Sequence, residues 1–238
     1  MSEPRIIPID SLDFDCEPTS WAYADERRAE IDVHFEKLKR AKPALWNGRV
    51  LLLHRYSLDD GGNSRVMRGA FLETDYASFV AWQDWGREEA GISDCFGAAA
   101  ILSSDGGYLV GVMGAHTYNA GDIYFPCGTP DPADLSAGKV DFEFSVRREL
   151  KEEAGLDASE FTSEPGWTLV IDGRLIAAIK VFHSTMTAEQ LRARILERLA
   201  HERLPELADI RIVRSSADFE PAMRRFVRAF LAHRFDNR

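Results

Sequence analysis

The chain has 238 residues, enough to bury one sizeable hydrophobic core, or one core with a smaller module. Its net charge of −10 argues against a nonspecific binder of nucleic acid or of an anionic membrane. No stretch approaches the roughly 18 apolar residues of a membrane span, and the first residues lack the pattern of a signal peptide. Three cysteines at unrelated spacings predict neither disulfides nor a zinc site and favour a reducing, cytoplasmic setting.

The first 94 residues are predicted to form a separate α+β module. Apolar periodicity and turn residues indicate a helix over 25–42 that ends at Pro43, strands over 50–53 and 65–72, and a short helix capped by Thr74 or Asp75. The glycine-containing segment 84–93 is the predicted boundary to a second domain over 95–238.

The second domain is predicted to consist of strands flanked by helices. The strand pattern gives two hairpins and two single strands, over 96–102 with 108–113, 123–125, 167–171 with 175–183, and 210–213. Helices are predicted over 187–203, with Thr187 as the cap, and over 220–233.

An acidic helix precedes the second hairpin. Glu149, Glu152 and Glu153 are spaced so that they project from one side of this helix as a cluster. Clustered carboxylates repel each other, and a divalent cation relieves that repulsion because hard cations take oxygen ligands. Arg148 has the i, i+4 spacing for an ion pair with Glu152, and Gly155 suits a left-handed C-cap. An apolar stripe over Phe142, Val146 and Leu150 is expected to anchor the helix against a sheet. The alternative is an ordinary solvated helix face.

This stretch resembles the Nudix box of the Nudix hydrolases, G-x5-E-x7-R-E-U-x-E-E-x-G-U, where U is a bulky aliphatic residue. The second half of the pattern is matched at every fixed position, by Arg148, Glu149, Leu150, Glu152, Glu153, Gly155 and Leu156. Gly128 matches the leading glycine, and Asp131 stands where many members carry an additional acid. The resemblance implies a Nudix-type α/β/α sandwich with a mixed sheet, in agreement with the strands and helices predicted for 95–238.

The sequence departs from the Nudix pattern in the loop before the helix. Gly128 to Arg148 spans 20 positions where the pattern spans 14, which leaves six extra residues (20 − 14). Val140 occupies the position of the first glutamate, and the candidates to replace it are Asp134, Asp141 and Glu143. Cys127 replaces a glycine often found there, which would be unfavourable if the position required a positive φ.

The resemblance implies hydrolysis of the diphosphate in a nucleoside diphosphate linked to another group X, with Mg²⁺ or Mn²⁺ as cofactor. By position, Glu149, Glu152 and Glu153 would be the metal ligands, with Arg148 orienting a carboxylate as a fourth catalytic residue. The general base is left open. Gly128 and Asp131 would contact the substrate, and His116, just before the preceding strand, is a further candidate.

The resemblance implies a small nucleoside diphosphate derivative as the substrate, and a nucleotide-sugar, a compound like ADP-ribose and a dinucleotide are all left open. The segment 43–48, together with the Pro-Cys-Gly-x-Pro-Asp-Pro turn, is loosely similar to Nudix enzymes that act on UDP-sugars. A noncatalytic Nudix-fold module that binds such a ligand is the alternative function. The N-terminal extension is large enough to mediate a homodimer.

Overall fold

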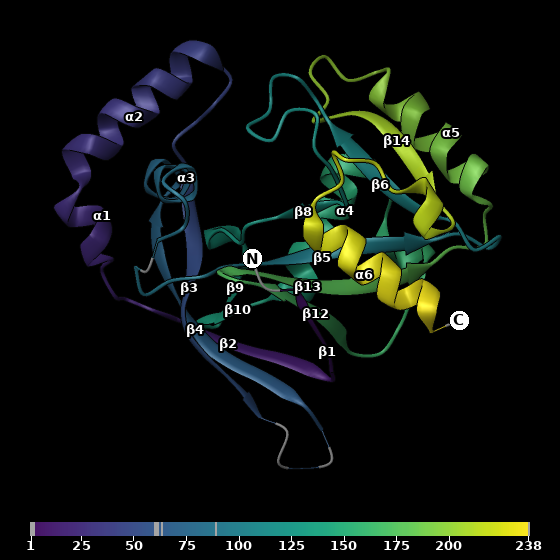
Figure 1. Cartoon of the computed structure of the whole chain (residues 1–238), viewed down its shortest axis with the longest axis horizontal. Helices are drawn as coiled ribbons and strands as arrows, with labels where there is room; N and C mark the ends of the chain where they lie inside the picture. The colour runs from purple at the N-terminus through teal and green to yellow at the C-terminus, as the bar shows by residue number, and fades with distance from the viewer. Residues whose placement is uncertain (1–2, 60–61, 63, 89, 238) are drawn as a thin grey trace.

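The computed structural model describes residues 3–59, 62, 64–88 and 90–237, which form two β-sheets with six α-helices (Figure 1). The larger sheet contains β1 (Arg5–Ile9), β5 (Asp94–Leu102), β6 (Tyr108–Met113), β7 (Ile123–Tyr124), β8 (Cys127–Gly128), β11 (Thr162–Ser163), β12 (Trp167–Asp172), β13 (Leu175–His183) and β14 (Leu207–Val213). The smaller sheet contains β2 (Ser11–Glu17), β3 (Arg49–Asp59), β4 (Val66–Asp75), β9 (Leu135–Ser136) and β10 (Lys139–Val140). The helices are α1 (Ala22–Glu26), α2 (Arg28–Ala41), α3 (Tyr76–Asp84), α4 (Phe142–Ala154), α5 (Ala188–Leu199) and α6 (Arg225–Asp236).

Helices cover both faces of the larger sheet. Its strand order is β1-β12-β13-β5-β6-β14, with β13 and β5 parallel and the other pairs on this path antiparallel. Successive residues of a strand face opposite sides, and β5 shows both covers. Gly97 faces α4, where a Cβ would collide with Val146, whereas the Phe96 ring lies 5.4 Å from the Phe226 ring of α6. A mixed sheet between helices confirms the predicted α/β/α sandwich.

The smaller sheet joins the N-terminal segment to the long loop before α4. Its order is β3-β4-β2-β10-β9, with β2 parallel to β4. Strands β9 and β10 belong to the loop between Gly128 and Arg148, and Lys139 of β10 lies opposite Asp15 of β2. The lengthened loop therefore packs on a part of the chain more than a hundred residues away in sequence.

Apolar packing crosses the predicted boundary near residue 94. β1 pairs with β12 in the larger sheet, and the Phe142 ring of α4 lies 5.0 Å from the Phe14 ring and 5.8 Å from the Phe71 ring. A second core, which includes Ile31 and Trp82, lies between α2, α3 and the smaller sheet. The division into domains over 1–94 and 95–238 stays a prediction. In the structure, residues of both segments contribute to the larger core.

Most predicted elements are present, but the last helix begins later than expected. Residues 220–224 do not join α6, because Met223 forms a parallel bridge with Ile123 and the Arg224 N–H donates to the Ile123 carbonyl. The predicted helix over 187–203 ends at Leu199, shortly before Pro205. Strands β1 and β2 were not predicted. In the described part of the chain, no helix is long and apolar enough to span a membrane.

Candidate active site

Helix α4 is fixed at both ends and along one side. The Asp141 side chain accepts a hydrogen bond from the Phe144 N–H at 2.9 Å, and Gly155 ends the helix with φ +67°. Phe142, Val146 and Leu150 are buried, which confirms the predicted apolar stripe. The helix therefore presents its carboxylates at a defined place beside β5 and β8.

The three glutamates of α4 lie in different environments. Glu153 is buried and the side chain of Glu149 is 12% exposed, whereas that of Glu152 is 58% exposed and bonds Arg148 at 2.9 Å. The predicted Arg148–Glu152 pair is thus present. Among the described residues, no three histidine, cysteine or acidic side chains are grouped so that they could hold a metal ion. The assignment of all three glutamates as metal ligands stays a prediction.

The turn before the helix brings backbone close to the buried carboxylates. The Cys127 N–H donates to Glu153 Oε1 at 3.4 Å, and Gly128 lies directly against the Glu149 carboxylate. The φ of Cys127 is not positive, so the expected strain from replacing a glycine there is absent. Burial, together with the charges of Glu153 and Glu149, raises the pKa of the Cys127 thiol well above its usual value. Cys127 therefore lines the cavity as an uncharged thiol.

Gly128→Ala is expected to lower kcat/KM for the substrate on the order of a hundredfold. A Cβ at this position would collide with Glu149 Oε1 and force the carboxylate to move, and a displacement of about 1 Å is enough for such a loss. Steady-state kinetics would measure the effect. Gly62→Ala is the control, because nothing lies within 4 Å of its Cβ position. Equal kinetics for the two variants would contradict the prediction.

Arg148 is the hub of the acidic groups. Its guanidinium bonds Asp134 at 2.9 and 3.2 Å, Glu149 at 3.0 Å and Glu152 at 2.9 Å, and approaches Asp131 at 3.5 Å. Burial alone would lower the pKa of Arg148, but the Asp134 hydrogen bond and the surrounding charges raise it above its usual value. Arg148 therefore stays charged and holds the acids in place.

Of the three candidates for the missing first glutamate, the structure brings only Asp134 to Arg148. Asp134 is buried and also accepts the Asp131 N–H at 3.0 Å. Asp141 caps α4, and Glu143 pairs with Arg147 at 2.7 Å. Asp134 is therefore the candidate that bonds Arg148, although it lies outside the sequence register.

The surroundings of Glu149 and Glu153 disfavour the ionised form of both carboxylates. Burial raises the pKa of Glu149 to about 7, with Arg148 opposing the shift and Glu152 adding to it. Burial, and then the charge of Glu149, raises the pKa of Glu153 well above its usual value. Among the residues that the structure describes, Glu153 Oε2 is buried and has no hydrogen-bond partner. A divalent cation fits these carboxylates, because it binds hard oxygen donors, would stabilise their ionised form and would satisfy the buried oxygen.

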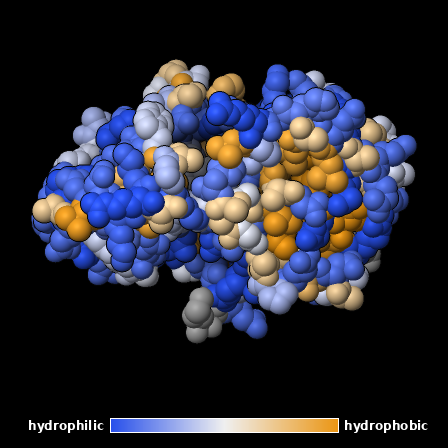
Figure 2. Space-filling view, turned by 90° about the horizontal axis from the view of Figure 1, so that it is seen from above, coloured by the Kyte–Doolittle hydropathy of each residue, from blue (hydrophilic) through white to orange (hydrophobic). Residues whose placement is uncertain are grey.

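A cavity of about 650 Å³ opens above these carboxylates, between the N-terminal segment and the larger sheet. Four of the predicted site residues that line it are Gly128, Asp131, Glu149 and Glu153. His116 lines it as well, whereas Arg148 and Glu152 are not among its lining residues. Figure 2, seen from above, shows a hollow between the two parts of the surface.

Sequence reasoning missed the wall that the N-terminal segment supplies. Residues after α2 and on α3 line the cavity, among them Trp46, whose side chain is 80% exposed. Three arginines also line it, at positions where no motif points to them: Arg49, Arg87 and Arg224. The helix predicted over 220–233 would include Arg224, but this residue precedes α6 and bonds Asp122 at 2.7 Å and Asn119 at 2.8 Å. The aromatic turn at 43–48 was the available sequence signal for this wall.

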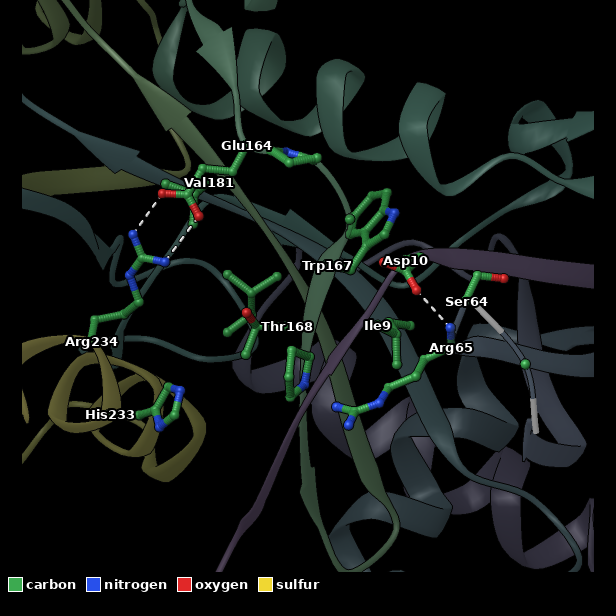
Figure 3. Close-up of a pocket in the computed structure, with 15 residues that line it drawn as sticks. Ile9, Asp10, Ser64, Arg65, Glu164, Trp167, Thr168, Val181, His233 and Arg234 are labelled. Carbon is green, nitrogen blue, oxygen red and sulfur yellow. Dashed lines mark hydrogen bonds and ion pairs between the residues drawn. The ribbon is translucent and has the colours of Figure 1, made fainter. Parts of the chain in front are cut away.

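A second cavity, of about 560 Å³, lies elsewhere on the larger sheet (Figure 3). Arg234 bonds Glu164 at 2.6 and 2.9 Å on one side of it, and the Arg65 N–H donates to Asp10 at 2.6 Å on the other. No residue of α4 or of the 127–131 turn lines it. The candidate active site is therefore the larger cavity.

Comparison with known proteins was made at three levels. No family model matches the chain, and no curated protein matches it. Among solved structures, the Nudix hydrolase RenU from M. smegmatis aligns over 60% of this chain and 83% of its own, with 15% identity and a TM-score of 0.36. The chain resembles Nudix hydrolases.

Two further structures show Nudix-like similarity of the same degree. The MutT protein from Methanosarcina mazei Go1 aligns over 60% of this chain and 92% of its own, with 20% identity and a TM-score of 0.38. A bifunctional NMN adenylyltransferase/ADP ribose pyrophosphatase from Francisella tularensis, complexed with AMP and a Mn ion, aligns over 67% and 46%, with 14% identity and a TM-score of 0.41. At these values the likeness carries no weight for activity, which is inferred below from the side chains.

Proposed function

We propose that the protein is a Nudix-type hydrolase that cleaves the diphosphate of a nucleoside diphosphate linked to another group X. The observation that carries this proposal is a pair of glutamates that line a large cavity: Glu153, which is buried, and Glu149, whose side chain is only 12% exposed. A structural helix gains nothing from two buried carboxylates with raised pKa values, because each costs stability when ionised.

Glu149 and Glu153, with Glu152 on the same helix, would hold Mg²⁺ or Mn²⁺, which would supply charge neutralisation for diphosphate oxygens and activation of a water molecule. Arg148 keeps Glu149 and Glu152 within 3.0 Å of its guanidinium and so fixes their direction. Gly128 lets the substrate and the backbone approach Glu149 without steric obstruction. The cavity wall formed by the N-terminal segment limits access of bulk water to the reacting groups.

The lining of the cavity supports a nucleotide derivative as substrate. Arg49 and Arg224 bring positive charge toward phosphate oxygens, and an exposed indole at Trp46 offers a flat apolar surface for a base or sugar ring. A nucleotide-sugar or a compound like ADP-ribose has both parts. In this proposal the 1–94 module serves the 95–238 domain as one wall of the substrate cavity.

Incubation with Mg²⁺ or Mn²⁺ and a panel of UDP-sugars, ADP-ribose, dinucleotides and nucleoside triphosphates tests the function. We expect release of a nucleoside monophosphate from at least one diphosphate derivative, and its loss when EDTA removes the metal. Restoration by added metal is the control for EDTA. Tight binding without turnover, in the presence of metal, would favour the noncatalytic module instead.

A further inference from the structure

An ion pair without complete partners lies on the cavity wall at the start of β5. Asp94, the first residue of β5, is 4% exposed, and its Oδ2 accepts from Arg87 Nη2 at a long 3.3 Å. Asp94 Oδ1 and Arg87 Nε are both buried and have no hydrogen-bond partner among the described residues. Both residues line the cavity.

The fold does not account for this pair. Strand β5 needs only the backbone of Asp94, whose N–H already donates to the Arg174 carbonyl. Each unsatisfied buried polar atom destabilises the folded protein. Arg87 also adopts φ +53°, a left-handed conformation that side chains rarely take, directly after Gly86 at φ +90°. Strain and unsatisfied polar atoms at one place indicate a functional constraint.

The pair lies close to the carboxylates of α4. Arg87, Asp94, Glu149 and Glu153 line the same cavity, and the charges of Glu153, Glu149 and Asp94 all act on the thiol of Cys127. Leu175 is opposite Asp94 in the sheet, and both Leu175 and Phe96 line the cavity beside it. The two polar atoms are thus framed by apolar side chains.

The unsatisfied atoms determine the kind of group that would bind. Asp94 Oδ1 is an acceptor and Arg87 Nε–H is a donor. A phosphate would meet the repulsion of Asp94, and a cation that of Arg87. A neutral hydroxyl satisfies both atoms, because it donates to the carboxylate and accepts from the guanidinium. The carbon skeleton of a sugar ring suits the neighbouring apolar side chains.

We infer that Arg87 and Asp94 form a hydroxyl-binding subsite for a sugar ring of the substrate. This inference rests on the proposed function and makes it more specific. The ring is either the ribose of the nucleoside or the sugar in group X, which offer the same chemistry. The subsite would select hydroxylated ligands by leaving its buried atoms unpaired when the hydroxyl is missing.

Binding of matched ligands tests the subsite independently of hydrolysis. With EDTA present, calorimetry compares UDP-glucose, its 2′-deoxyuridine counterpart and UDP-2-deoxyglucose in the wild type, Asp94→Asn and Arg87→Gln. We expect wild type to bind UDP-glucose about 10- to 100-fold more tightly than one of the deoxy ligands, as for a charged hydrogen bond. The deoxy ligand that loses affinity identifies the ring.

In both variants the ratio of the affinities for UDP-glucose and the deoxy ligand is expected to fall toward one, because the hydroxyl no longer has its charged partner. Asp209→Asn, an ion-paired aspartate outside the cavity lining, is the control and should keep the wild-type preference. Melting temperatures verify folding.

An unchanged preference in both variants, an equal loss for all ligands, or no binding by the wild type overturns the inference. Hydrolysis by the wild type alongside an unchanged preference rejects the subsite and leaves the proposed function standing. The expected preference without any hydrolysis supports the subsite and rejects the proposed function.

Discussion

Glu153→Gln is expected to reduce turnover of the nucleotide substrate about a thousandfold. Glu153 is buried at the base of the cavity, and its Oε2 has no protein partner, so it is the carboxylate most available to a divalent cation. Loss of metal-dependent charge stabilisation amounts to several kcal/mol of activation free energy. Steady-state kinetics at saturating Mg²⁺ would measure the loss.

The same variant is expected to be at least as stable as wild type at neutral pH. The pKa of Glu153 is higher in the folded protein than in the unfolded chain. At a pH above the unfolded pKa, ionisation of Glu153 therefore opposes folding, and glutamine removes that destabilisation. A decrease in activity with an unchanged or higher melting temperature would separate function from folding. Glu143→Gln, on the same helix but paired with Arg147, is the matched control. Full activity in Glu153→Gln would reject the site.

Asp134→Asn is expected to destabilise the protein by about 3 kcal/mol, or roughly 6–12 °C in melting temperature. Asp134 is buried and bonds two nitrogens of Arg148, so the variant leaves a partly buried guanidinium without its principal counter-charge. Activity should fall as well, since Arg148 also holds Glu149 and Glu152. Thermal unfolding with parallel kinetics measures both.

Asp141→Asn is the control for Asp134→Asn. Asp141 caps α4, and asparagine is nearly as good a cap, so we expect a change of only a few tenths of a kcal/mol. If the two variants lost the same stability, the assignment of Asp134 as the partner of Arg148 would fail.

Local patterns predicted the fold well, because they depend on residues that are close in sequence. The α4 stripe, its glycine cap and the two hairpins of the larger sheet were all readable in this way. Features that depend on distant partners were not. Met223 forms a bridge with Ile123, so that α6 begins only after it. Strand β10 pairs with β2, which is far from it in sequence.

The candidate site was predictable to a similar extent. Helical spacing placed Glu149, Glu152 and Glu153 on one helix, but tertiary packing leaves Glu152 58% exposed and outside the cavity lining. The inserted loop shifted the register, so only its folded path reveals Asp134 beside Arg148. Arg87 and Asp94 form no motif, and their proximity depends on how α3 leads into β5.

The pairing of β10 with β2 bears on how this protein can be dissected. A chain shortened to residue 95 onward would leave β10 without its neighbour β2 and would expose the edge of β12 that β1 covers. It would also lack the Phe14 and Phe71 rings, which pack on Phe142 of the acidic helix. The lengthened loop before α4 and the N-terminal segment are therefore structurally interdependent. In a minimal catalytic fragment, the exposed faces of the loop and of the larger sheet would both have to be redesigned.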